Sequence, residues 1–165
     1  YVNDAGRQMD ILALSTWLRY LAACGIAIDF PANAYQGDYV RRMAQAIHAR
    51  HGDRFRRGVT AEAFRPALSE PDEELRLDGL IALARRTLGE DYAYIHGYAL
   101  NEQLEDCRSD LAEFGVIFDH WFSEQSLFDS ELIERVRHGR STIDEEMLIS
   151  FNHEITGRTM GARNH

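Results

Sequence analysis

The helical spacing of apolar residues constrains this fold more than any other feature of the sequence. In the first segment that shows it, apolar side chains recur at i, i+3, i+4 and i+7, at Leu14, Trp17, Leu18 and Leu21. This spacing puts them on one face of a helix, and Gly25 is a typical helix stop. The sequence therefore predicts an amphipathic helix over residues 7–24, with Trp17 as a core anchor rather than a platform for nucleic-acid bases.

Three further segments repeat this spacing and predict helices over about residues 37–51, 70–88 and 90–114. The last of them carries apolar residues in alternating steps of four and three, at Leu100, Leu104, Cys107, Leu111 and Phe114. Two more helices are expected near residues 129–138 and 142–156. Residues 52–71 hold glycine and proline among charged residues, which predicts a mobile connection with a helical turn at most.

The start of the helix over residues 70–88 has a clear capping signal. Ser69 supplies a hydroxyl, Pro71 suits a first turn, and the acidic side chains around it face the positive end of the helix dipole. We therefore expect Ser69 to be the capping residue.

Strand signals are scarce. Val116, Ile117 and Phe118 are consecutive β-branched or aromatic residues directly after a glycine, which predicts a short buried strand. The expected fold class is mainly α, with five or six helices and one or two short strands.

The charge of the chain argues against nonspecific binding to nucleic acid. Its formal net charge is −9, whereas phosphate contacts draw their affinity from basic side chains. All 18 basic residues are arginine, which excludes a phosphate-gripping or Schiff-base lysine within these residues. No stretch approaches the roughly 20 apolar residues of a membrane helix, so we expect a cytoplasmic protein without membrane contact.

Cysteine and histidine give no metal signature by spacing. Cys24 and Cys107 lie far apart among apolar residues, which indicates buried free thiols rather than a disulfide or half of a metal site. His48 and His51 are three residues apart on a predicted helix, but no third ligand lies near them in the sequence. We expect no metal site.

Four blocks of the sequence occur in an order that is typical of one protein family. They are Asn3-Asp4-Ala5-Gly6-Arg7-Gln8, the Y-x-G-D-Y element at 35–39, the D-L-x-x-F-G-V-x-F-D segment at 110–119 and W-x-S-E-x-S-L at 121–127. Alone, the Asn3-Asp4 pair would be read as a helix N-cap. Together the blocks resemble bacterial arginyl-tRNA synthetases over about residues 1–136.

The resemblance implies a fold and a division of the chain. Residues 1–136 would be an excerpt of the α/β Rossmann-type catalytic domain of a class I synthetase, with a helical insertion over about residues 36–95. Residues 137–165 have no counterpart in the family pattern and are expected to form a helical tail.

Glu124 is the residue that we most expect to recognise a substrate. A guanidinium presents a planar fork of N–H donors, and a carboxylate can accept two of them in parallel. In the family the matching glutamate faces the guanidinium of arginine. The alternative is that Glu124 caps the following helix or is a solvated surface acid.

The resemblance places other polar residues at the same site with less detail. Asn3, Asp4 and Gln8 would line the floor of the active site, at the carboxyl ends of parallel strands. Asp119 could orient neighbours in this region. None of these is expected to be a catalytic residue.

For the complete enzyme, the resemblance implies activation of L-arginine with ATP and Mg²⁺, followed by transfer to tRNA(Arg). The family's ATP-binding HIGH motif and its downstream signature loop do not occur in these 165 residues. We therefore expect the chain alone to bind no cofactor and to be inactive. The alternative is a non-catalytic helical protein derived from the family, which binds a partner or itself through an unpaired strand edge.

Overall fold

The computed structural model describes residues 2–124 and 126, which fall into two units. The helical unit is Gly6–Gly115. The terminal unit combines Tyr1–Ala5 with the chain from Val116 onward, of which residues 2–5, 116–124 and 126 are described. Each unit is considered by itself.

The helical unit contains four long helices and three short ones. They are α1 (Arg7–Ala23), α2 (Asp38–His51), η1 (Arg54–Arg56), η2 (Ala61–Phe64), α3 (Arg65–Leu68), α4 (Glu73–Leu88) and α5 (Asp91–Glu113). The four long helices match the four that apolar spacing predicts, within about three residues at each end. The mainly helical fold class is confirmed.

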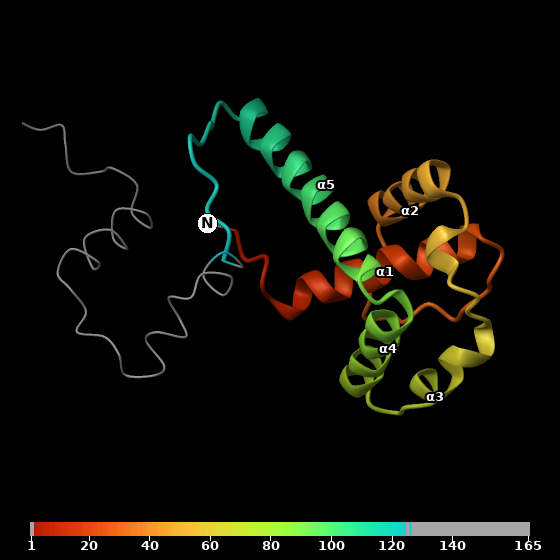
Figure 1. The fold of residues 1–165 in the computed structure, drawn as a ribbon. Helices are drawn as coiled ribbons and strands as arrows, with labels where there is room; N and C mark the ends of the chain where they lie inside the picture. The colour runs from red at the N-terminus through yellow and green to blue at the C-terminus, as the bar shows by residue number, and fades with distance from the viewer. Residues whose placement is uncertain (1, 125, 127–165) are drawn as a thin grey trace, which may run out of the picture. The chain divides into compact units, whose positions relative to one another are not determined.

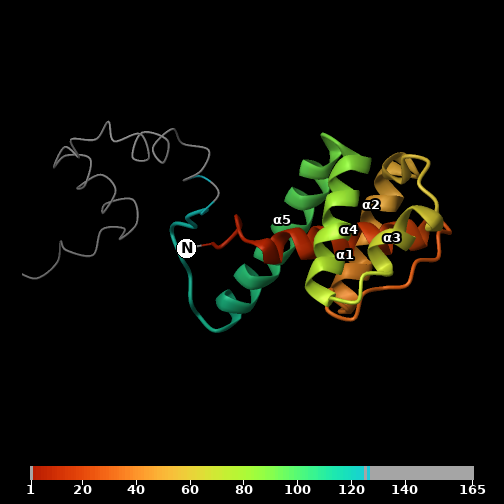
Figure 2. The same ribbon diagram turned by 90° about the horizontal axis from the view of Figure 1, so that it is seen from below.

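Helix α1 is the centre of the helical unit. Helix α2 lies on one side of α1, α3 and α4 lie on the other, and α5 crosses it (Figures 1 and 2). Because α1 has neighbours on several sides, its buried residues form a continuous run from Ile11 to Leu18. Helix α2 contacts its neighbours on one face only, and it buries a stripe of Val40, Met43, Ala44 and Ile47.

Trp17 anchors this core, as the sequence predicts. Its side chain is fully buried, and its ring lies 5.7 Å from that of Phe64. Its indole Nε1 donates a hydrogen bond of 2.9 Å to the carbonyl oxygen of Phe55, which satisfies the one polar atom of the side chain. Phe55 and Phe64 belong to η1 and η2, so the tryptophan holds this connection against the core.

The connection over residues 52–71 has more structure than the sequence indicates. It contains η1, η2 and α3, and its apolar residues Phe55, Val59 and Phe64 are buried. Arg54 and Arg57 also form ion pairs with Asp91 at the start of α5. The burial of these apolar residues orders the segment. The sequence did not indicate this, because they are too few and too irregularly spaced to show a helical period.

The capping residue of α4 differs from the prediction. Oδ1 of Asp72 accepts hydrogen bonds of 2.9 Å from the backbone N–H groups of Glu74 and Leu75. The Ser69 hydroxyl instead donates to the carbonyl oxygen of Arg65, one turn back in α3. The prediction that Ser69 caps α4 is therefore wrong, because Asp72 is the residue whose carboxylate reaches the free N–H groups.

The strand predicted at Val116–Phe118 does not form within the described residues, where the only strand-like pairing is an isolated parallel bridge between Val2 and Ser123. Ile117 is 82% exposed, so the predicted burial is absent as well. A strand needs hydrogen-bonding partners along its length, and apolar composition alone does not supply them.

The remaining predictions concern the cysteines, membrane helices and the residues after 126. Both cysteines are free, as predicted, but Cys24 is half-buried and Cys107 is exposed. No described helix is long and apolar enough to cross a membrane. The helices expected near 129–138 and 142–156, and the tail over 137–165, lie outside the described residues.

Candidate functional site

Two segments 120 residues apart in the sequence lie side by side in the terminal unit. The backbone N–H of Val2 donates to the carbonyl oxygen of Phe122 at 2.7 Å, and the N–H of Glu124 donates to the carbonyl oxygen of Val2 at 2.9 Å. These two bonds make the parallel bridge between Val2 and Ser123. The bridge therefore joins the opening block of the sequence to the W-x-S-E block.

Side chains extend this junction. The Ser123 hydroxyl donates a hydrogen bond of 2.5 Å to Oδ2 of Asp4. The Ser123 hydroxyl oxygen also accepts from the backbone N–H of Ser126 at 3.3 Å, in the i to i+3 pattern of a helix N-cap. One hydroxyl can make both bonds, since it has one donor and two lone pairs. Asp4 thus holds Ser123, the residue that links the bridge to Ser126.

Glu124 follows Ser123 directly and is half-buried. Its backbone is held by the bond to Val2, while its carboxylate has no partner among the described residues. Among the described residues, the side-chain contact typical of a cap is made by Ser123. Glu124 presents a carboxylate on a fixed backbone, available as a hydrogen-bond acceptor.

The other predicted site residues lie in different surroundings. Asp4 is only 5% exposed, so its carboxylate is better placed to position Ser123 than to meet a ligand. Asn3 and Asp119 are exposed residues of the terminal unit. Gln8 belongs to α1 in the helical unit, where its Oε1 accepts a hydrogen bond of 3.1 Å from the Tyr35 hydroxyl. The structure therefore brings Asp4 and Glu124 into one unit, and Gln8 belongs to the other.

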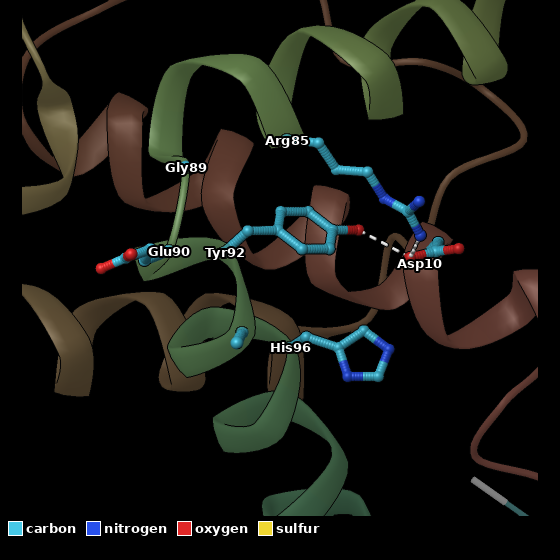
Figure 3. Close-up of a pocket in the computed structure, with 7 residues that line it drawn as sticks. Asp10, Arg85, Gly89, Glu90, Tyr92 and His96 are labelled. Atoms are coloured by element: carbon cyan, nitrogen blue, oxygen red, sulfur yellow. Dashed lines mark hydrogen bonds and ion pairs between the residues drawn. The ribbon is translucent and has the colours of Figure 1, made fainter. Parts of the chain in front are cut away.

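A second candidate is a hollow of about 480 Å³ in the helical unit, lined mainly by α4, α5 and Asp10 of α1. Figure 3 shows Arg85 and Tyr92 converging on Asp10, with the His96 ring nearby. Oδ1 of Asp10 accepts from Arg85 Nη2 at 2.7 Å and from the Tyr92 hydroxyl at 2.8 Å.

The electrostatics of this hollow are those of a closed polar network. The hydrogen bond to Asp10 raises the pKa of the Arg85 guanidinium. Burial raises the pKa of Tyr92, and the Asp10 carboxylate raises it further, so the phenol stays protonated and keeps donating. These three groups satisfy one another, which is the expected arrangement of a junction between helices. The hollow therefore stabilises the helical unit, and the junction around Glu124 is the better candidate site.

Sequence reasoning missed Ser123 and the partners of Asp10. Ser123 stands inside the W-x-S-E block, so its position next to Glu124 was a usable signal. The contacts of Asp10 with Arg85 and Tyr92 span 75 and 82 residues, and no local pattern predicts contacts at such separations.

Comparison with known proteins gives a consistent result. The chain is 62% identical over 138 residues to an arginine–tRNA ligase of Nitrosospira multiformis, a match that covers 84% of this chain and 24% of that protein. It is 60% identical over 141 residues to an arginine–tRNA ligase of Nitrosomonas eutropha, a match that covers 82% of this chain and 24% of that protein. It is 58% identical over 146 residues to an arginine–tRNA ligase of an Azoarcus species, a match that covers 82% of this chain and 25% of that protein.

Comparisons with protein-family models and with solved structures found no match. The chain spans about a quarter of the length of the curated relatives that it matches. The resemblance drawn from the sequence blocks is confirmed, and this chain corresponds to one segment, about a quarter of the full length, of proteins in the arginine–tRNA ligase family.

Proposed function

We propose that this chain is the part of a cytoplasmic arginine–tRNA ligase that carries one wall of the arginine pocket. The complete protein would activate L-arginine with ATP and Mg²⁺ and transfer it to tRNA(Arg). The observation that carries the proposal is the bridge between Val2 and Ser123, because it fixes the backbone of Glu124 while leaving its carboxylate without a described partner.

The chemistry of Glu124 suits arginine better than lysine. Two parallel N–H donors of a guanidinium match the two oxygens of one carboxylate, whereas an ammonium acts as a point charge. A half-buried position strengthens such a pair, since the effective dielectric constant is lower there than in water. Glu124 would therefore contribute to both the affinity and the choice of amino acid.

Asp4 and Ser123 would act as positioning residues. The Ser123 hydroxyl bonds both the Asp4 carboxylate and the Ser126 N–H, so it fixes the backbone on both sides of Glu124. A carboxylate that must accept two donors at once loses affinity when its backbone shifts. Removing either partner should therefore weaken arginine binding without removing the recognition group itself.

The chain alone would not activate arginine. Activation requires the ATP phosphates, a divalent ion and the amino-acid carboxylate to be held together. The described residues offer the junction around Glu124 and no assembled phosphate site. We expect no arginine-dependent exchange of pyrophosphate into ATP from the purified chain, and clear exchange activity would refute this part of the proposal.

A chimeric enzyme tests the role of Glu124. The matching segment of the Nitrosospira multiformis ligase is replaced by the corresponding residues of this chain, and arginine-dependent exchange is measured. Glu124→Gln should raise KM for arginine by about 10- to 100-fold, as expected for the loss of a hydrogen bond between charged groups. KM for ATP should change little.

The matched control is Glu113→Gln, which neutralises an exposed carboxylate at the end of α5. It should leave both KM values unchanged. An unchanged KM for arginine in Glu124→Gln would contradict the assignment of Glu124. The chimera that contains the unsubstituted segment of this chain should be active. If it is inactive, the two segments are not equivalent.

The positioning role has its own test in the same chimera. Ser123→Ala should raise KM for arginine by roughly fivefold, the effect of about 1 kcal/mol. Ser123→Thr keeps the hydroxyl and should restore most of the affinity. Equal effects of the two variants would argue against the hydroxyl as the positioning group.

A second candidate function is self-association, and one observation favours it. Val116, Ile117 and Phe118 are exposed apolar residues that belong to no helix or strand and have no strand partner among the described residues. Such a segment can pair with another chain. Light scattering of the purified chain tests this: a dimer that Ile117→Lys dissociates would favour it, and a monomer at all concentrations would exclude it.

A further inference from the structure

The ends of α1 and α2 bring together three side chains that commonly bind transition metals. Cys24 directly follows α1, His48 lies in the last turn of α2, and Asp53 lies just beyond that helix. One ligand atom from each residue lies within 4.8 Å of the other two. A cysteine, a histidine and a carboxylate from three sequence positions thus converge at one point.

These ligand atoms are close to the separation that a metal ion requires. A zinc ion lies about 2.0–2.3 Å from sulfur, nitrogen and oxygen ligands, so ligand pairs around it are separated by roughly 3–4 Å. His48 Nε2 and Asp53 Oδ1 are already 3.2 Å apart. Closing the remaining gap to the Cys24 sulfur requires shifts of less than about 1–2 Å, within the reach of side-chain rotation.

The local electrostatics favour a cation. Both α1 and α2 end here, and the carbonyl groups at helix C-termini carry partial negative charge. Asp53 adds a full negative charge. Arg56 opposes this, because its Nη1 lies 3.9 Å from Oδ2 of Asp53, but Oδ1 is the oxygen that faces His48.

The site is supported by its surroundings, and three candidate protein ligands converge there among the described residues. The His48 ring packs edge-on against Tyr20, with ring centroids 5.8 Å apart, which restricts its orientation. The Tyr20 hydroxyl donates to the carbonyl of Gly52 and accepts from the N–H of Phe55, so it is not a fourth ligand. A fourth position would be taken by water, as in zinc sites with three protein ligands.

We propose that Cys24, His48 and Asp53 bind a divalent transition metal of the zinc class, with the fourth position open to water. The proposal does not depend on the proposed function, since Glu124, Ser123 and Asp4 belong to the terminal unit and Cys24, His48 and Asp53 to the helical unit. The bound ion would join the end of α1 to the end of α2. Sequence spacing could not indicate the site, because Cys24 is 24 residues away from His48 along the chain.

Cobalt(II) tests the proposal in the 165-residue chain. A thiolate bound to cobalt gives a near-ultraviolet charge-transfer band, and only Cys24 and Cys107 can supply a thiolate. Titration with CoCl₂ should produce this band in the unsubstituted chain and in Cys107→Ser, and zinc should displace it. Cys24→Ser should abolish the band while the helical circular dichroism stays unchanged.

The histidine and the carboxylate are tested by affinity. His48→Asn should weaken cobalt binding by more than about 100-fold, since losing a direct ligand costs more than losing an outer partner. Asp53→Asn should weaken it as well, and His96→Asn, which changes a histidine of the hollow, should not. Absence of the band from the unsubstituted chain, its persistence in Cys24→Ser, or unchanged affinity in His48→Asn would each overturn the proposal.

Discussion

The helical unit and the terminal unit hold their apolar side chains in opposite ways. In the helical unit Trp17, Phe55 and Phe64 are fully buried, and the largest aromatic side chain also has its polar atom paired. In the terminal unit Ile117 is 82% exposed and Phe118 is 55% exposed. The helical unit is therefore stabilised by burial, and the described terminal residues by a bridge and a few side-chain hydrogen bonds.

This difference separates the source of stability from the candidate site. Elements with little apolar burial contribute least to the free energy of unfolding, and binding segments are often drawn from them. Glu124 lies in such a segment, whereas the hollow around Asp10 belongs to the well-packed unit. Substitutions in the two units should therefore have different effects on stability.

The two tryptophans should give the largest contrast. Trp17→Ala removes a fully buried side chain and should lower the free energy of unfolding by about 3–5 kcal/mol. Trp121→Ala removes a half-buried side chain of the terminal unit that packs edge-on against Phe118, and it should cost less, about 1 kcal/mol. Urea unfolding followed by circular dichroism measures both losses, and equal losses would show that the two units do not differ in how far burial stabilises them.

The polar network around Asp10 should have the next largest effect. Asp10→Ala leaves the Tyr92 hydroxyl and the Arg85 guanidinium without their shared acceptor, which should cost about 1–3 kcal/mol. Asp29→Ala is the matched control, because Asp29 is exposed and should change stability little. Similar urea midpoints for the two variants would show that the network contributes nothing.

The start of α4 distinguishes the observed cap from the expected one. Asp72→Ala should destabilise the helical unit by about 1 kcal/mol, since two backbone N–H groups lose their acceptor. Ser69→Ala should cost less than about 0.5 kcal/mol. Thermal unfolding of both variants provides the measurement, and a larger effect at Ser69 would reverse the assignment.

A pair of isoleucines gives the smallest but cleanest comparison. Ile95 of α5 is fully buried, and Ile95→Val should cost about 0.5–1.5 kcal/mol. Ile117→Val makes the same chemical change at a side chain that is 82% exposed, so the free energy of unfolding should stay the same within about 0.5 kcal/mol. A measurable loss at Ile117 in urea unfolding would mean that this residue is buried in solution.

Local signals explain which parts of the fold the sequence could predict. The four long helices follow from apolar spacing within single segments, and their ends agree within about three residues. The order in η1, η2 and α3 was not predicted, because it comes from scattered aromatic side chains that meet a distant helix. Composition predicted a strand at Val116–Phe118, but composition cannot supply a hydrogen-bonding partner.

The candidate site divides in the same way. The sequence blocks indicated Glu124 and the opening segment, and relatedness to the arginine–tRNA ligases supports the family from which these roles were taken. The roles of Asn3, Asp4, Gln8, Asp119 and Glu124 stay predictions. The contact of Ser123 with Asp4 spans 119 residues, and its geometry came from the structure alone.

Patterns along the chain were enough to predict the four long helices, the role of Trp17 as a core anchor and the relationship to one segment of a ligase family. Helical period and motif order are properties of neighbouring residues, so they can be read along the chain. Only the folded structure shows that Asp72 caps α4, that Val2 pairs with Ser123 and that Cys24 lies close to His48 and Asp53. Those contacts depend on how helices and extended segments pack in space, which the spacing of residues along one segment does not specify.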